Sequence, residues 1–146
     1  MSAYGKKTQW IGIAKNLYYG YNIDNIIHIH TKGAGSMEHV HDILIKFSKE
    51  VRKIIGDSLK KVIVYGSYAR GDYSENSDID IMILTTLSDD EIRKVENTIY
   101  DIAFDFQMDY LVDISVIVKN EKQFQYWLGA LPFYDNVQKE GVVISG

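Results

Sequence analysis

The fold of this chain is decided by residues 61–84, which read KVIVYGSYARGDYSENSDIDIMIL. The stretch begins with a short β-branched run that ends at Gly66, and such a run predicts a buried strand. It ends with a second apolar run over residues 79–84, which predicts another strand after a polar loop. The stretch therefore predicts two strands, joined by a glycine turn and a loop, at the centre of a sheet.

A helix is predicted on the N-terminal side of these strands, over residues 40–55. Apolar side chains recur there at helical spacing, while charged side chains fill the opposite face. Gly56 follows the last apolar residue and ends the pattern.

The chain after the second strand predicts a helix, a third strand and two more helices. Ser88 and Glu91 have the spacing of a capping box, which starts the first of these helices. Residues 112–118 predict the third strand, Asn120 caps the next helix, and Pro132 suits the first turn of the last one. This order of elements predicts an α/β (α+β) fold, a mixed sheet with helices packed mainly on one side.

The predicted domain occupies residues 37–146, and residues 1–36 differ from it in composition. The whole chain has 146 residues, which suits one domain. Residues 1–36 are rich in Tyr, Ile and Asn and end in a glycine-containing stretch that is typical of a linker. We interpret them as an N-terminal arm that would allow a homodimer, or as a leader or tag-like segment, and the sequence leaves both interpretations open.

The composition argues against several classes of protein. There is no cysteine, hence no disulfide framework and no thiolate metal site, which fits a cytoplasmic protein. No apolar run approaches the roughly 18 residues of a membrane-spanning helix. The net charge of −4 and the scattered lysines argue against a long nucleic-acid ligand. They do not exclude a nucleoside triphosphate, which brings its own Mg²⁺.

A phosphate-binding turn is indicated where the first strand ends. Gly66 permits a sharp bend and a close approach of a ligand to the backbone. Ser67 and Tyr68 would open a short helix, whose free N–H groups attract phosphate. The Ser67 hydroxyl and the guanidinium of Arg70 would add a hydrogen-bond donor and a positive charge.

Two carboxylates lie where the second strand begins. Asp78 and Asp80 are two residues apart, so their side chains share one face of the strand. Like charges this close repel unless a cation lies between them, and Mg²⁺ prefers oxygen ligands. A solvated loop end is the alternative, but Asp80 lies between two isoleucines in a run apolar enough for a central strand.

A third acid, Asp113, interrupts the apolar run of the third predicted strand. An acid inside such a strand is costly unless it has a partner. Beside the second strand, Asp113 would join Asp78 and Asp80, and three carboxylates would hold two metal ions about 3.5–4 Å apart. An ion pair with a buried Lys or Arg is the structural alternative.

The compound motif, GSYARG at residues 66–71 followed by SDID at residues 77–80, resembles the signature of the DNA polymerase β-like nucleotidyltransferase superfamily. Within that superfamily the short chain resembles the minimal nucleotidyltransferases, the antitoxin partners of HEPN-domain toxins. The resemblance runs from about Met37 to the C-terminus, and residues 1–36 have no counterpart in it.

The resemblance implies a nucleotidyltransferase fold and a role for each site residue. Gly66 and Ser67 would hold the β- and γ-phosphates of ATP, and Arg70 would support that loop or a phosphate. Both acids at the start of the second strand would ligate two Mg²⁺ ions. Asp113 would bind the catalytic metal and help to deprotonate the acceptor hydroxyl.

The resemblance also implies the reaction, which is transfer of AMP from ATP to a hydroxyl, expected to be a tyrosine, of a HEPN toxin. Residues 37–146 leave no room for the second, helical domain with which larger relatives grip the acceptor, so the acceptor would bring its own surface. Two alternatives stay open. One is transfer to a small hydroxylated molecule such as an aminoglycoside, and the other is a non-catalytic toxin-binding module.

Two further features are interpreted as structural. Asp101, Asp105 and Asp109 recur at every fourth residue and predict a solvated helix face. Tyr126 and Trp127 are predicted to be packing anchors for the C-terminal part of the chain.

Overall fold

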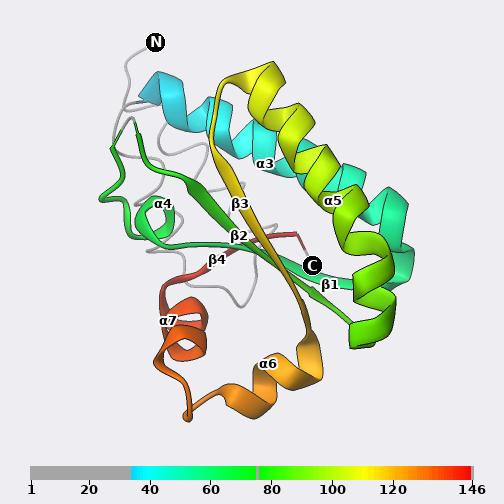
Figure 1. The fold of residues 1–146 in the computed structure, drawn as a ribbon. Coiled ribbons are helices and arrows are strands. Elements are labelled where there is room, and N and C mark those ends of the chain that lie inside the picture. Colours follow the sequence, from blue (N-terminus) through cyan, green and yellow to red (C-terminus); the bar gives the residue numbers. More distant parts are fainter. Residues whose placement is uncertain (1–33, 75, 146) are drawn as a thin grey trace.

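The computed structural model describes residues 34–74 and 76–145 (Figure 1). Four strands in this part of the chain form one sheet with the order β3-β2-β1-β4. Their bounds are Leu59–Tyr65 for β1, Ile79–Thr85 for β2, Ile114–Asn120 for β3 and Val142–Ser145 for β4. β1 is antiparallel to β2 and β4, while β2 and β3 are parallel. The predicted mixed sheet is therefore confirmed.

Helices cover the two faces of this sheet to different extents. The two long helices, α3 (Ala34–Ile55) and α5 (Asp89–Tyr110), lie side by side over one face (Figure 1). The shorter α6 (Glu121–Trp127) and α7 (Pro132–Glu140) lie against the other face. The greater part of the helical cover is thus on one side, as predicted.

The larger core lies between the sheet and the two long helices. Because side chains alternate along β2, Ile81 and Ile83 face this side, where neither has any exposed surface. Phe47 of α3 and Ile99 of α5 belong to the same cluster and are equally buried. The rings of Phe47 and Phe106 pack edge to face with 5.6 Å between their centroids. The core on this side excludes water from the middle of the sheet.

A smaller core lies on the opposite face. Met82 and Leu84 alternate with the isoleucines of β2 and pack with Phe124 of α6 and Val137 of α7. Asp80 continues the same alternation toward the start of β2, so its side chain belongs to this face. Met82 is fully buried whereas Asp80 is half-buried, so the cover of this face ends between the two.

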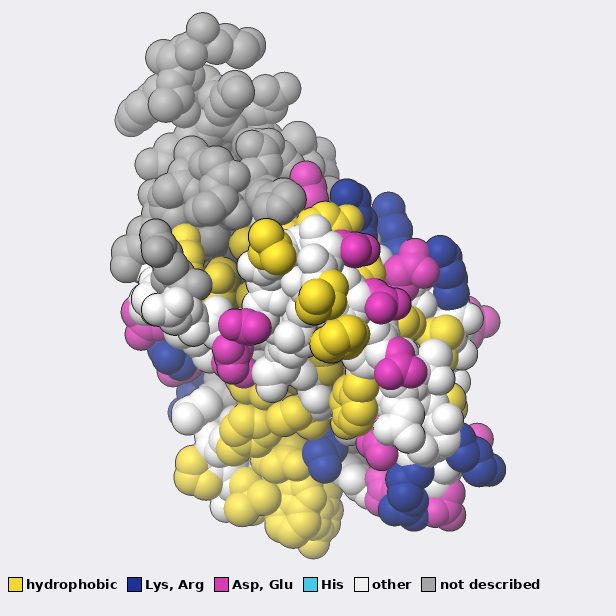
Figure 2. Space-filling model, turned by 45° about the horizontal axis from the view of Figure 1, so that its top comes forward, with side chains coloured by type: hydrophobic (Ala, Val, Ile, Leu, Met, Phe, Trp, Pro, Cys, Tyr) yellow, Lys and Arg dark blue, Asp and Glu magenta, His cyan; other side chains and the backbone are white. Residues whose placement is uncertain are grey.

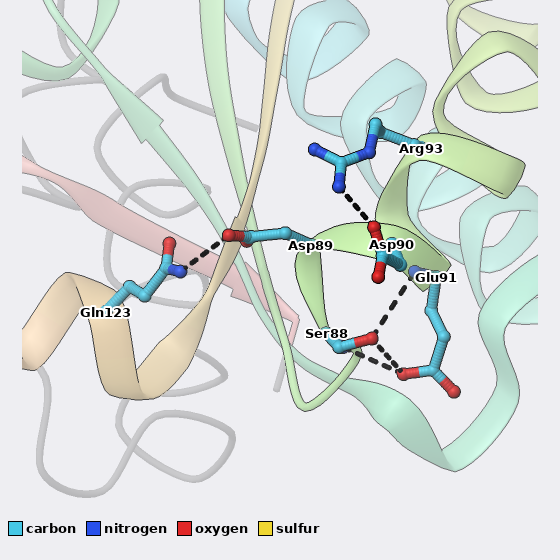
Figure 3. Close-up of polar contacts among 6 residues, drawn as sticks. All are labelled: Ser88, Asp89, Asp90, Glu91, Arg93 and Gln123. Carbon is cyan, nitrogen blue, oxygen red and sulfur yellow. Dashed lines mark hydrogen bonds and ion pairs between the residues drawn. The ribbon is translucent and has the colours of Figure 1, made fainter.

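α5 begins at a capping box, as predicted (Figure 3). The Ser88 hydroxyl accepts a hydrogen bond from the Glu91 backbone N–H at 3.4 Å, and the Ser88 N–H donates to the Glu91 carboxylate at 2.8 Å. The side chain of Gln123 in α6 donates to Asp89 at 2.8 Å (Figure 3). These bonds satisfy donors at the start of α5 and tie that helix to α6.

Several elements differ from the prediction, among them β1, which begins at Leu59, two residues before the predicted run. β3 begins at Ile114, two residues later than predicted, because Leu111 ends α5 in a left-handed conformation and the chain must still turn into the sheet. β4 was not predicted, since its four residues are too short for a pattern and form a strand by pairing with β1. α3 begins at Ala34, before the predicted start.

The prediction for residues 1–36 lies outside the described residues, except for residues 34–36, which are the first residues of α3. The division into an arm and a domain therefore stays a prediction. None of the helices in the described ranges is both long and apolar enough to cross a membrane.

Candidate active site

The turn after β1 brings the backbone of Gly66 against a carboxylate of β2. Tyr65 and Asp80 are partners in the β1–β2 register, so the end of one strand lies beside the start of the other. Gly66 has a φ of 72°, and a Cβ built on it would lie 2.5 Å from Oδ2 of Asp80. Only glycine fits this approach without strain. The predicted phosphate turn and the predicted acidic pair therefore meet at one point.

α4 (Ser67–Arg70) follows Gly66 as a single helical turn, as predicted. The Arg70 N–H donates to the Gly66 carbonyl at 3.0 Å, and the Gly71 N–H donates to the Ser67 carbonyl at 2.9 Å. Gly71 closes the turn with a φ of 77°. Ser67 lies half-buried at the start of this turn, where the first N–H groups of a helix favour an anion.

Arg70 fastens this turn to the C-terminal part of the chain. Its Nε donates to Asp72 at 3.3 Å, and its Nη1 donates to Glu140 of α7 at 3.4 Å. These bonds hold Arg70 against the loop and α7, and both roles implied for Arg70 stay predictions. Glu140 was not predicted as a site residue, because it lies 70 residues further along the chain and no local pattern marks it.

The loop between α4 and β2 is held from both of its ends. The rings of Tyr68 and Tyr73 stack with 4.4 Å between their centroids, which fastens the start of the loop to α4. Near its end, the Ser77 N–H donates to the Ser74 carbonyl at 3.0 Å, and the Ser74 N–H donates to the Ser77 hydroxyl at 2.8 Å. This small turn fixes the backbone immediately before Asp78.

Asp78 and Asp80 are a pair of interacting carboxylates. Asp78 is exposed in the loop before β2, and Asp80 is half-buried in the strand itself. Burial raises the pKa of Asp80 above its ordinary value, the negative charge of Asp78 raises it further, and the positive charge of Arg70 lowers it. The two acids therefore repel one another when both are ionised, as the sequence predicts for this pair.

Asp113 does not lie inside a strand, contrary to the prediction. It is exposed and immediately precedes β3, so neither a buried acid nor a buried ion pair is found there. Its carbonyl accepts the Ile79 N–H at 2.8 Å, which places it beside the start of β2. Burial, then Tyr73, then the charge of Asp113 raise the pKa of Tyr68, so the Asp113 carboxylate also lies near α4.

The three acids do not form a metal-binding cluster in this structure. Among the described residues, no group of three or more His, Asp or Glu side chains is close enough to hold a metal ion. The donor chemistry of the pair nevertheless fits a divalent cation, because carboxylate oxygens are the ligands that Mg²⁺ prefers. A cation between Asp78 and Asp80 would also relieve the repulsion that raises the pKa of Asp80.

Tyr65 is a residue at the site that the sequence did not single out. Burial and the charge of Asp80 raise its pKa to about 12, so its hydroxyl stays protonated at neutral pH. Its ring packs edge to face against Phe133 of α7, with 5.6 Å between centroids. Two features of the sequence could have marked Tyr65 as a site residue. It directly precedes Gly66, and it lies two residues after Ile63, so both side chains are on the face of β1 that holds the smaller core.

The predicted packing anchor at Tyr126 and Trp127 is wrong. Tyr126 is 75% exposed and Trp127 is 38% exposed, and their rings pack against one another with 5.0 Å between centroids. The buried aromatic residue of α6 is Phe124, because the helical period turns that position toward the sheet.

Two relatives from Methanocaldococcus jannaschii share much of this sequence. The chain is 34% identical over 103 residues to "Putative protein adenylyltransferase MJ0141", a match that covers 70% of this chain and 96% of that protein. It is 38% identical over 86 residues to "Putative protein adenylyltransferase MJ0604", which covers 59% of this chain and 78% of that protein.

A solved structure and a family model also match. The structure, described as "Crystal structure of the toxin-antitoxin with AMP-PNP", overlaps with 70% of this chain and 73% of that chain, at 19% identity and a TM-score of 0.44. The model of the nucleotidyltransferase domain matches residues 44–144, a range that holds every candidate site residue. On the strength of the family model and the sequence relatives, this chain belongs to the nucleotidyltransferase domain family.

Proposed function

We propose that this chain transfers AMP from ATP to a hydroxyl of a partner protein, in the cytoplasm. The observation that carries the proposal is the contact between the Gly66 turn and the Asp80 carboxylate, with Asp78 two residues away. A phosphate-binding turn and a cation-binding pair that lie this close suit a triphosphate with its metal. Membership of the nucleotidyltransferase family supports the reaction class. The names of the two relatives, both called protein adenylyltransferases, support a protein as the acceptor.

The proposed roles follow the positions of the residues. Asp78 and Asp80 would hold Mg²⁺, expected to be two ions, which would offset the negative charge of the phosphates. Gly66 and Ser67 would contact the β- and γ-phosphates, and Arg70 keeps the turn in place through its bonds to the loop and to α7.

Asp113 is proposed to take the proton in the transfer step. The acceptor oxygen attacks the α-phosphorus, the bond from that phosphorus to the bridging oxygen breaks, and pyrophosphate leaves. The acceptor proton passes to a carboxylate, and Asp113 suits this role because it is exposed and lies beside the start of β2. Its exposure leaves room for an acceptor that arrives from solution.

The partner is proposed to be a HEPN-type toxin, modified on tyrosine, with this chain as its antitoxin. The support is the resemblance of the motif to minimal nucleotidyltransferases. The structure adds that the described residues form one sheet with its helices. We expect the acceptor to supply its own binding surface.

The test uses the purified chain, labelled ATP, Mg²⁺ and the purified product of the neighbouring gene. We expect label on that protein, and mass spectrometry should place one AMP on a tyrosine. Asp78→Asn with Asp80→Asn should abolish labelling, whereas Asp57→Asn, an exposed aspartate at the far end of β1, should preserve it. Labelling that survives the double variant would contradict the proposal. Turnover of a small hydroxylated molecule without any protein would favour the alternative acceptor.

A further inference from the structure

A row of exposed apolar side chains follows one face of α5. Tyr100, Phe104 and Met108 recur at every fourth residue and so share one side of the helix, and Leu111 follows them directly after the last residue of α5. Their exposed fractions are 41%, 58%, 61% and 89%. Figure 2 shows hydrophobic side chains in a line over this helix. Single exposed apolar residues are ordinary, but a continuous row, here called the apolar row, indicates a contact surface.

A leucine at position 111 does not contribute to the stability of the fold. It ends α5 with a φ of 53°, a left-handed conformation in which glycine is the usual residue. This conformation is strained for a residue with a side chain. With 89% of its surface exposed, the leucine gains almost nothing in return from packing.

An acidic row runs beside the apolar row. Asp101, Asp105 and Asp109 are exposed, and no ion pair within the described part of the chain includes them. The last turn of α5 holds no basic residue. Acids near the C-terminus of a helix face the negative end of its dipole, and acids four residues apart repel one another. Figure 2 shows acidic side chains in a line next to the hydrophobic ones.

We propose that the two rows form a docking surface for a partner protein that presents apolar side chains flanked by lysine or arginine. The apolar row supplies area that the partner removes from water. The acidic row supplies attraction at long range and selects the sign of the partner's charge. Basic side chains of the partner would also relieve the repulsion within the acidic row, so the charges of α5 complement this occupant.

A second copy of this chain fits the surface less well. Two α5 helices that pair antiparallel about a two-fold axis would bring their acidic rows together, and any pairing would join two chains that each have a net charge of −4. The lysines of α3, which are Lys46, Lys49 and Lys53, have the opposite charge and are exposed. In the described part of α3, however, the large apolar side chain exposed beside them is Ile54, which is 40% exposed. One such side chain offers too little apolar surface to complement the four of the apolar row.

The surface leads toward the candidate active site. The apolar row ends at Leu111, and Asp113 follows two residues later beside the start of β2. A protein bound along α5 would reach the site from this end of the sheet. That the occupant is the AMP acceptor rests on the function proposed above, whereas the docking itself does not.

The test is a binding measurement without nucleotide, so that its outcome is independent of catalysis. The probe is a fluorescent amphipathic helix of about five turns, with leucine on one face and lysine on the other. A leucine–glutamate helix of the same pattern and a scrambled lysine–leucine peptide are the controls. We expect the full chain to bind the lysine–leucine helix at least about tenfold more tightly than either control, and less tightly as salt is added.

Matched variants locate the binding on α5. Phe104→Ser with Met108→Ser should weaken binding about tenfold, and so should replacing all three acids of the acidic row by asparagine. Tyr126→Ser, which removes an exposed aromatic side chain from α6, should leave the affinity within about twofold. Circular dichroism melts check that each variant is folded.

Four outcomes would overturn the proposal. The first is equal binding of the leucine–glutamate helix, and the second is a loss of affinity in Tyr126→Ser as large as the loss in the α5 variants. The third is self-association of the native chain in sedimentation that Phe104→Ser with Met108→Ser abolishes, because a second copy would then be the occupant.

The fourth outcome comes from the rate of alkylation of a cysteine placed in the apolar row. The chain has no cysteine, so the variant Met108→Cys carries a single thiol. Slow alkylation of that thiol in the free chain would show that the surface is already covered, whereas fast alkylation slowed by the lysine–leucine helix supports docking.

Discussion

The two faces of β2 carry different tasks. On the side of α3 and α5, Ile81 and Ile83 have no exposed surface and belong to the larger core. On the side of α6 and α7, Met82 is equally buried, but Asp80 next to it is half-buried beside the Gly66 turn. The candidate site is therefore the part of the sheet that the short helices leave uncovered. One strand thus provides stability through one face and chemistry through the other.

The largest expected effect on activity comes from removing the two negative charges, Asp78 and Asp80, at the exposed start of β2. Asp78→Asn with Asp80→Asn should lower AMP transfer by about 10³-fold or more, because the cation-binding oxygens lose their charge. The midpoint of urea unfolding should stay the same or rise, because a half-buried carboxylate with a raised pKa is replaced by a neutral group. Loss of both activity and folding would show that the pair is structural.

The opposite result, a loss of stability without a loss of activity, is expected for the larger core between the sheet and the two long helices. Phe47 is fully buried and packs against Phe106, so Phe47→Ala should lower the free energy of unfolding by about 3–5 kcal/mol. Transfer activity per folded molecule should stay close to that of the native chain at low temperature. Urea denaturation and an activity assay on the same samples measure both quantities. A fall in activity per folded molecule would contradict the claim that this face of β2 serves stability alone.

Glycine variants measure how tightly the turn fits against Asp80. Gly66→Ala should destabilise the fold by about 1–3 kcal/mol, through its positive φ and through the clash of its Cβ with Asp80 Oδ2. Gly56→Ala is the matched control, because Gly56 also has a positive φ, 55°, but its Cβ would meet nothing within 4 Å. We expect the control to cost only about 1 kcal/mol and to leave transfer unchanged. Equal costs for the two variants would mean that the approach of Gly66 to Asp80 is loose.

The smallest effect concerns the titration of Asp80. Carboxyl NMR should find its pKa above the ordinary value of 3.8, lower in Asp78→Asn and higher in Arg70→Gln, since Asp78 raises this pKa and Arg70 lowers it. Because folding raises the pKa, the folded state binds this proton more readily than the unfolded state. Asp80 therefore favours folding at a pH below its unfolded pKa, and this contribution is lost as the pH rises through its folded pKa. Shifts of the opposite sign in the two variants would contradict the described electrostatics.

Local signals in the sequence predicted the parts of the site that local structure determines. The β-branched run before Gly66, the two acids at the start of β2 and the capping box at Ser88 each depend on neighbours within a few residues. All three are found where they were predicted.

Contacts between distant segments were not predictable in this way. Glu140 reaches Arg70 across 70 residues, and β4 exists as a strand because β1 pairs with it. The exposure of Asp113 depends on the way the chain leaves α5 at Leu111, a backbone conformation that the apolar pattern of the following run does not encode. The same limit applies to Tyr126, whose exposure follows from the rotation of α6 against the sheet.

The central claim is that the Gly66 turn and the acidic pair of β2 bind one ligand together, a triphosphate with its metal. Calorimetry with a non-hydrolysable ATP analogue tests this most directly, with and without Mg²⁺, on the native chain and on Asp78→Asn with Asp80→Asn. The claim predicts binding by the native chain that requires Mg²⁺ and is lost in the double variant. Binding of equal strength without Mg²⁺, or in the double variant, would contradict it.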